Sequence, residues 1–162
     1  MADRASAALL AGIAIAVVGL DQLSKRVVEA RLGASGPGTG IALAGDWVRL
    51  EYVENRGAAF GIFSGFTPLL AAASVAIVLF LVIQFSRAAN ADLLRAATIG
   101  MIVGGAIGNL LDRVRLGYVV DFISVGSWPK FNIADSAITI GVATLVIDWV
   151  LTERQAANVE RA

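Results

Sequence analysis

Two aspartates, Asp121 and Asp135, stand at the two ends of one short connection between hydrophobic segments, in the runs VVDFI and FNIADS. The chain contains no histidine and no cysteine, which excludes Ser-His and Cys-His nucleophiles, thiol redox chemistry and the usual zinc sites. Carboxylates are the strongest remaining acid/base candidates. A short connection can return the chain beside its starting point, so we expect the two carboxylates to share one site at a membrane surface. Two close carboxylates cannot both ionise cheaply, so one would act as general base and the other as general acid, activating water against an amide.

Each aspartate taken alone also has a plainer interpretation. Asp121 could be a residue of an exposed loop. Asp135 precedes an apolar segment and could be the N-cap of its helix, where a carboxylate accepts free backbone N–H groups. A third aspartate, Asp148, lies near the far end of the last apolar segment, and we interpret it as an interfacial anchor with no catalytic role.

Other polar residues lie at the ends of apolar segments, where a buried charge is costly and is rarely kept without a use. Asp21 and Lys25 have i,i+4 spacing and could form a local ion pair worth only a few tenths of a kcal/mol. Asn109, Asp112 and Arg113 share one helix face by i,i+3 and i,i+4 spacing. The alternative for Asp112 and Arg113 is that they mark the water interface.

The composition is that of a membrane protein. Of the 162 residues 57% are hydrophobic, the mean hydropathy is +0.76, and 13 basic residues balance 13 acidic ones. The balanced charge argues against nucleic-acid binding. Apolar runs near the ~20 residues that cross a bilayer occur at about 7–28, 68–85, 93–111 and 134–151. The sequence therefore predicts an α-helical integral membrane protein of four transmembrane helices, with residues 1–162 forming a single membrane domain.

Four spans place both termini on the same side of the membrane. The first run could be a cleaved signal peptide, but it is long, ends in charged residues and is followed by no clear small-x-small cleavage site, so we expect a retained helix. The opposite side carries more basic residues in total, but the terminal side is much shorter and denser in them, which favours both termini in the cytoplasm. The basic residues on that side are Arg4, Arg87, Arg95, Arg154 and Arg161.

The only sizeable segment between spans is about 31–66. It opens with the Gly-rich stretch GASGPGTG, typical of a flexible linker. Val48, Leu50 and Tyr52 then alternate with charged residues at the period of a half-buried strand, before a polar turn at 55–57. We expect a small β-hairpin or curved sheet, an extracytoplasmic cradle lying on the membrane surface.

Five motifs in this order resemble the bacterial lipoprotein signal peptidase family, also called signal peptidase II, whose members are integral-membrane aspartic proteases. The resemblance covers nearly the whole chain, and it is the order of the motifs that makes it specific. The motifs are DQLSK at 21–25, ENRGAAFG at 54–61, GNLLDR at 108–113, VVDFI at 119–123 and FNIADS at 131–136.

The resemblance implies cleavage of the signal peptide from bacterial prolipoproteins, immediately before a cysteine that carries diacylglycerol. It implies that Asp121 and Asp135 are catalytic and that no metal or cofactor is used. The implied partners are lipid-modified prolipoproteins, membrane lipids and peptide-like antibiotic inhibitors of the globomycin type. The implied location is the bacterial inner membrane, with the site near its extracytoplasmic surface. The implied substrate-binding and supporting residues are Asp21, Lys25, Asn55, Gly57, Asn109, Asp112, Arg113, Asn132 and Ala134.

Two other functions remain open at this point. Intramembrane carboxylates, asparagines and arginines also occur in small transporters and proton pathways, although no inverted repeat is visible here. A Ser-Lys peptidase would need Ser24 and Lys25, but adjacent helix positions diverge by about 100° and do not face each other.

Overall fold

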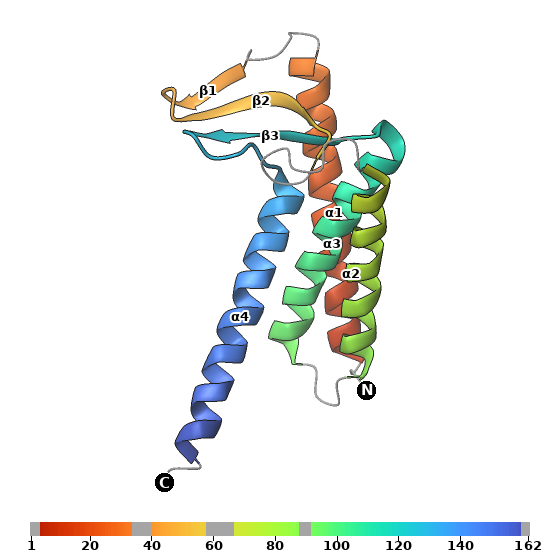
Figure 1. The fold of residues 1–162 in the computed structure, drawn as a ribbon, viewed down its shortest axis with the longest axis vertical. Coiled ribbons are helices and arrows are strands. Elements are labelled where there is room, and N and C mark those ends of the chain that lie inside the picture. The colour runs from red at the N-terminus through yellow and green to blue at the C-terminus, as the bar shows by residue number, and fades with distance from the viewer. Residues whose placement is uncertain (1–3, 34–39, 58–66, 88–91, 160–162) are drawn as a thin grey trace.

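The computed structural model describes residues 4–33, 40–57, 67–87 and 92–159. In this part of the chain helices run side by side and a small sheet lies across one end of them (Figure 1). In chain order the elements are α1 (Arg4–Leu32), β1 (Gly40–Ala44), β2 (Val48–Asn55), α2 (Thr67–Arg87), α3 (Leu93–Leu116), β3 (Val119–Val125) and α4 (Ile133–Val159).

The helix α3 contacts each of the other three helices and forms the centre of the bundle. Glycines on α3 allow this close packing. A Cβ on Gly104 would lie 2.7 Å from the carbonyl oxygen of Ala14 in α1, and a Cβ on Gly105 would lie 2.5 Å from that of Ala134 in α4. Small residues of this kind let helix backbones approach closely inside a membrane.

Three helices in the described part are long and apolar enough to cross a membrane: Arg4–Leu32, Leu93–Leu116 and Ile133–Arg154. The fourth expected span corresponds to a shorter apolar helix, Pro68–Gln84. The chain is therefore a mostly helical, multi-pass membrane protein.

The helices extend beyond the predicted spans of about 7–28, 68–85, 93–111 and 134–151. The largest differences are at the ends of α1, α3 and α4, where polar residues continue the helix past the apolar run. Hydropathy marks the segment that fits the bilayer core, whereas the backbone hydrogen bonds of a helix continue until a residue ends them. In α3 that residue is Gly117, which adopts the left-handed conformation with φ of 81°.

The expected hairpin is present as β1 and β2, which pair antiparallel. A third strand, β3, pairs antiparallel with β2 and completes a sheet of order β1-β2-β3. This strand lies in the expected connection between the third and fourth spans, but a strand at 119–125 was not predicted from the sequence. The run VVDFISV is rich in β-branched residues and is buried over most of its length, as expected for a strand covered on both faces.

A hydrophobic cluster fixes the sheet to the helices. Its buried members are Val28 and Leu32 from the end of α1 and Phe122 from β3, and partly buried residues of β2 and α4 pack against them. The sheet thus lies directly on the ends of α1 and α4.

Parts of two predicted features lie outside the described residues. They are most of the Gly-rich linker, 34–39, and the segment 58–66, which includes the end of the ENRGAAFG motif.

Candidate active site

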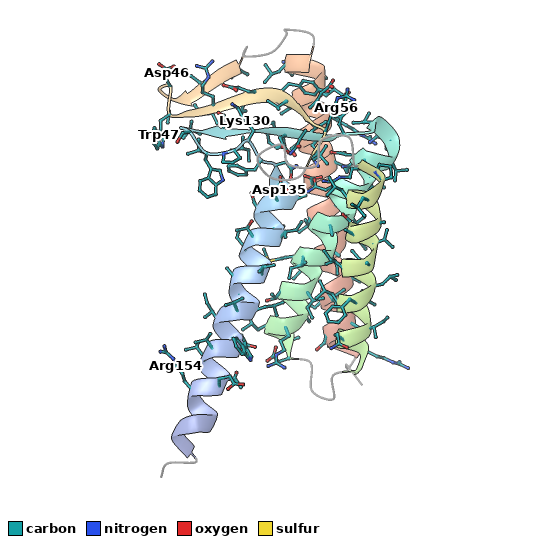
Figure 2. The ribbon with its side chains drawn as sticks, in the orientation of Figure 1. Asp46, Trp47, Arg56, Lys130, Asp135 and Arg154 are labelled. Carbon is teal, nitrogen blue, oxygen red and sulfur yellow. The ribbon has the colours of Figure 1, made fainter. Side chains whose placement is uncertain are left out.

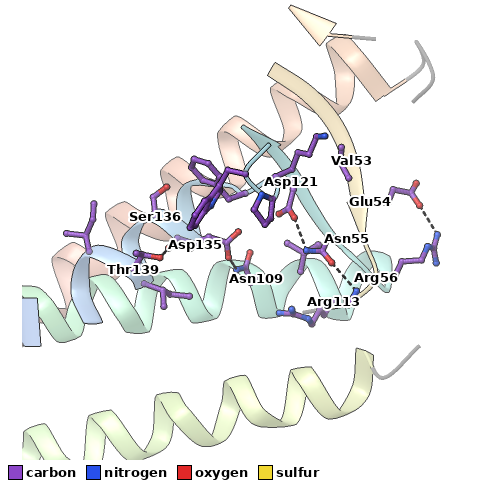
Figure 3. A pocket seen from close by; sticks show the side chains of 18 residues that line it. Val53, Glu54, Asn55, Arg56, Asn109, Arg113, Asp121, Asp135, Ser136 and Thr139 are labelled. Atoms are coloured by element: carbon purple, nitrogen blue, oxygen red, sulfur yellow. Dashed lines mark hydrogen bonds and ion pairs between the residues drawn. The ribbon is translucent and has the colours of Figure 1, made fainter. Parts of the chain in front are cut away.

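The structure brings Asp121 and Asp135 to one cavity of about 1000 Å³, and we call this pair the dyad (Figure 3). Asp121 is the third residue of β3 and only 2% exposed, so its interpretation as an exposed loop residue was wrong. Asp135 lies in the first turn of α4, at the end of that helix nearest the sheet, whereas Arg154 lies towards the opposite end (Figure 2). The dyad is therefore at the junction of the helices and the sheet.

The start of α4 is organised around Asn132, which precedes the helix. Its Oδ1 accepts the backbone N–H of Asp135 at 2.9 Å, and its own backbone N–H donates to Asp135 Oδ2 at 3.2 Å. This reciprocal pattern is a capping box. The N-cap is thus Asn132 and not Asp135, which corrects the second plain interpretation.

Side-chain amides hold both members of the dyad. Asn55 Nδ2 donates to Asp121 Oδ2 at 2.8 Å, and Asn132 Nδ2 donates to Asp121 Oδ1 at 2.8 Å. Asn109 Nδ2 donates to Asp135 Oδ1 at 2.8 Å. With the backbone N–H of Asn132 added, every carboxylate oxygen of the dyad accepts a hydrogen bond, so both side chains have fixed orientations.

A buried group of ions lies behind the dyad, and we call Lys25, Asp21 and Asp112 the lysine cluster. Lys25 Nζ lies 2.8 Å from Asp21 Oδ2 and 2.8 Å from Asp112 Oδ2, and donates to Asn109 Oδ1 at 2.9 Å. The exposed fractions of Lys25, Asp21 and Asp112 are 3%, 0% and 2%. The ion pair of Asp21 and Lys25 is therefore buried and is not a surface contact. Asp112 is also buried and does not mark the water interface.

The carboxylates of the lysine cluster also accept backbone N–H groups from the elements that carry the dyad. Asp21 Oδ1 accepts the N–H of Ala134 at 3.0 Å, and Asp112 Oδ2 accepts that of Val120 at 3.2 Å. Since these residues each precede a dyad aspartate by one position, the cluster fixes the backbone of both.

The environment of Asp121 favours its protonated form. Burial is the main cause, and the charge of Asp135 adds to it, while the amides of Asn55 and Asn132 and the charge of Lys25 act in the opposite direction. The net effect raises the pKa of Asp121 to about 7. A carboxyl group that is partly protonated at neutral pH can donate a proton to a substrate.

The remaining predicted residues also lie at this site. Arg113 is half-buried and lines the cavity, where its charge interacts with both members of the dyad. Gly57 donates its backbone N–H to Asn55 Oδ1 at 3.0 Å. The residues that the sequence pointed to as catalytic, substrate-binding or supporting are therefore gathered at one end of the helices.

The sequence analysis missed several residues that line the cavity. Trp128, Pro129, Lys130 and Phe131 do so from the segment between β3 and α4. Their position in the sequence was the available signal, because the run WPK directly precedes the motif FNIADS and Phe131 is the first residue of that motif. Another residue that was not predicted is Gln22, whose Nε2 donates to Asp112 Oδ1 at 2.9 Å.

The Ser-Lys alternative has no support in the structure. Ser24 Oγ donates to the backbone carbonyl of Asp21 at 2.9 Å, and the three N–H groups of the Lys25 ammonium face three oxygens of other residues. The transporter alternative is also unsupported, because the four buried or half-buried carboxylates of the site lie at one end of the helices. The ion pair of Arg95 and Asp148, at 3.2 Å, joins α3 to α4 away from them.

Comparisons with known proteins agree with this geometry. The model of a family described as signal peptidase (SPase) II matches residues 13–151. A lipoprotein signal peptidase of Halothermothrix orenii is 40% identical over 135 residues, which cover 83% of this chain and 90% of the relative. A lipoprotein signal peptidase of Dehalococcoides mccartyi is 46% identical over 142 residues, which cover 85% and 86%.

A solved structure is also similar. It is described as a bacterial membrane enzyme determined by the in meso method at 2.3 Å resolution, and it superposes with a TM-score of 0.78 at 35% identity. The match covers 85% of each chain. The family match over most of the sequence, the identities and the shared fold together show that this chain belongs to the signal peptidase II family of aspartic peptidases.

Proposed function

We propose that this protein is a membrane-embedded aspartic endopeptidase that removes the signal peptide from diacylglyceryl-modified prolipoproteins, cutting immediately before the lipidated cysteine. The observation that carries the proposal is the pair of carboxylates, Asp121 and Asp135, lining one cavity in a chain that belongs to this family. The relatives named as lipoprotein signal peptidases support the choice of substrate.

In the proposed reaction a water molecule lies between the two carboxylates. Asp135, which lies in the first turn of α4 where the helix dipole favours negative charge, removes a proton from this water as it attacks the scissile carbonyl. Asp121, whose pKa is raised to about 7, gives its proton to the carbonyl oxygen and later assists departure of the amine. No covalent intermediate forms.

The amides keep this geometry, and a cation completes the site. Asn55, Asn109 and Asn132 hold the carboxylates by hydrogen bonds of 2.8 Å and need not reorganise during the reaction. Arg113, which lines the same cavity, binds a carbonyl of the substrate backbone.

The cavity is lined by apolar as well as by polar side chains. Besides the dyad it is lined by Trp128, Phe131 and, on α4, by Ile138 and Ile140. Ile140 is 55% exposed and lies on a helix that spans the membrane, so acyl chains can reach this wall from the bilayer. This wall suits the lipid of the substrate, and peptide-like inhibitors of the globomycin type would bind beside the dyad.

The proposed topology has four spans within a single domain of residues 1–162. The apolar part of α2, Pro68–Gln84, is at the lower limit of the ~17–25 residues that cross a bilayer, and Val78 and Leu81 pack it against the core of the bundle. The start of α1 and the end of α4 lie at the end of the helices opposite the sheet (Figure 1). We place both termini in the cytoplasm, the protein in the bacterial inner membrane, and the dyad near the extracytoplasmic surface.

The test is a cleavage assay with purified protein in lipid bicelles and a lipidated prolipoprotein. The expected result is release of the signal peptide and, by mass spectrometry, a product that begins at the lipidated cysteine. The matched control is Asp148→Asn, which removes a carboxylate of the same type at the other end of the helices and should leave cleavage unchanged. Absence of cleavage, or cleavage at another bond, would show that the proposed function is wrong.

A further inference from the structure

The three asparagine amides at the dyad have one feature in common: the carbonyl oxygen of each is held by a group that can only donate. Gly57 N–H donates to Asn55 Oδ1 at 3.0 Å, and Asp135 N–H donates to Asn132 Oδ1 at 2.9 Å. The ammonium of Lys25 donates to Asn109 Oδ1 at 2.9 Å. An amide whose oxygen is fixed in this way must turn its NH₂ group to the other side, and in all three cases that side is a dyad carboxylate.

Two of these three contacts come from the backbone, but the third comes from a side chain. The Lys25 ammonium does not line the cavity and is 3% exposed. It lies behind Asn109 as seen from Asp135, and its positive charge polarises the amide between them, which strengthens the hydrogen bond from Asn109 Nδ2 to Asp135 Oδ1. Asn132 Nδ2 also donates to Asn109 Oδ1, at 3.1 Å, so both contacts set the orientation of this amide, and Lys25 is the one of the two donors that carries a charge.

The hydrogen-bond donors around Asp121 differ from those around Asp135. Among the residues that the structure describes, the donors to Asp121 are neutral side-chain amides. Asp135 accepts from the amide that Lys25 polarises and from the backbone N–H of Asn132 at the start of α4. The asymmetry makes Asp135 the better place for the single negative charge of the pair.

We propose that Lys25 is a positioning residue of the dyad. Lys25 acts through Asn109: it directs the amide N–H of Asn109 to Asp135 and so keeps Asp135 as the anionic member of the pair. This inference rests on the proposed function and adds the division of labour within the dyad. Although Asp21 and Asp112 offset much of its charge, Lys25 still favours the ionised form of Asp121 through space, whereas its contact through the amide of Asn109 leads to Asp135. The other charged groups that line the cavity are Arg113 from α3, Glu54 and Arg56 from β2 and the turn after it, and Lys130 from the segment before α4.

The experiment compares Lys25→Met/Asp112→Asn with Asp112→Asn alone in single-turnover cleavage of a lipidated prolipoprotein across pH. The double variant removes one positive and one negative charge together, because Lys25→Met alone would leave two buried carboxylates without a cation. Relative to Asp112→Asn, the double variant should shift the acid limb of the pH–rate profile upward by about one unit. On the acid side of the profile, the rate of the double variant should be about tenfold lower than that of Asp112→Asn, and at higher pH the two rates should converge. KM should be unchanged, because Lys25 does not line the cavity.

A second variant, Asn109→Ala, leaves both ion pairs of the lysine cluster in place and removes the amide that joins Lys25 to Asp135, together with the hydrogen bond that this amide accepts from Asn132. It should give the same upward shift of the acid limb, and adding Lys25→Met/Asp112→Asn to it should give no further shift. This arm tests the inference even if the variant at Lys25 does not fold.

The outcomes separate the inference from the proposed function. No cleavage by the unaltered protein would contradict the proposed function. Cleavage by the unaltered protein, with the acid limb unmoved in Asn109→Ala or with the rate lowered equally at every pH, would overturn the role given to Lys25.

Discussion

A Cβ on Gly108 would lie 2.7 Å from Oδ2 of Asp21, the same oxygen that forms the ion pair with the ammonium of Lys25. Gly108 belongs to α3 and Asp21 to α1, so the absence of a side chain at position 108 is what lets the lysine cluster form between the two helices. Ala134 lies on the same side, with its Cβ 3.5 Å from that position.

Gly108→Ala should therefore destabilise the protein and slow cleavage, although alanine is the better helix former by up to about 1 kcal/mol. The new methyl group must displace a buried carboxylate, and we expect a loss of about 1 to 3 kcal/mol in the free energy of unfolding. Gly12→Ala is the matched control, since it is in α1 and a Cβ there meets nothing within 4 Å. Thermal unfolding in detergent measures both, and equal melting temperatures for the two variants would contradict this account of Gly108.

The stability of the protein should fall as pH rises through the range in which Asp121 titrates. The pKa of Asp121 is raised from 3.8 to about 7 in the fold, so between these values the folded state keeps a proton that the unfolded state has lost. Each pH unit in this window then lowers the free energy of unfolding by up to about 1.4 kcal/mol. Above about pH 7 this contribution levels off.

Asp121→Asn removes that titration, so its melting temperature should change less between pH 5 and 8 than that of the unaltered protein. The comparison uses only the change with pH, which separates it from any constant cost of placing an amide beside Asn55 and Asn132. Asp148→Asn should keep the full dependence. If the melting temperature of Asp121→Asn changed with pH as much as that of the unaltered protein, the raised pKa of Asp121 could not be the cause of this pH dependence.

The sequence was informative where the local chemistry is unusual. Charged residues inside apolar runs are costly, so Asp21, Lys25 and Asp112 could be singled out as candidate functional residues without a structure. The sequence did not show that Lys25 reaches both carboxylates and Asn109 together, because that depends on how α1 packs against α3.

The strand β3 was missed for a physical reason. Periodicity reveals a strand that is half-exposed, such as β2, whereas a strand buried on both faces shows a continuous apolar run that could equally be a connection or part of a helix. The cap at Asn132 could have been found, since asparagine followed three residues later by an acidic residue is a local start signal for a helix.

The lipid on the substrate should act mainly by position. Its acyl chains lie in hydrocarbon before and after binding, so they contribute little net affinity although each buried CH₂ is worth about 0.8 kcal/mol relative to water. The anchor instead fixes the depth of the scissile bond at the level of Asp121 and Asp135. A prolipoprotein with the lipid-bearing cysteine changed to serine, presented in the same bilayer, should be cut far more slowly at saturation.

This prediction is checked by single-turnover rates for the lipidated substrate and its serine counterpart at saturating concentrations. The mature sequence and the signal peptide stay the same in both, so only the anchor differs. Equal saturating rates would mean that the enzyme recognises the peptide alone, and the positional role of the lipid would be rejected.

The central claim is that Asp121 and Asp135 act together on one water molecule, and the most direct measurement is the single-turnover rate of Asp121→Asn and of Asp135→Asn on a lipidated prolipoprotein. Loss of either general acid or general base should lower the rate by about 10³-fold or more, while both variants remain folded in the membrane. Asp148→Asn, measured beside them, should cleave at the rate of the unaltered protein. A folded dyad variant that cleaved at close to that rate would contradict the account.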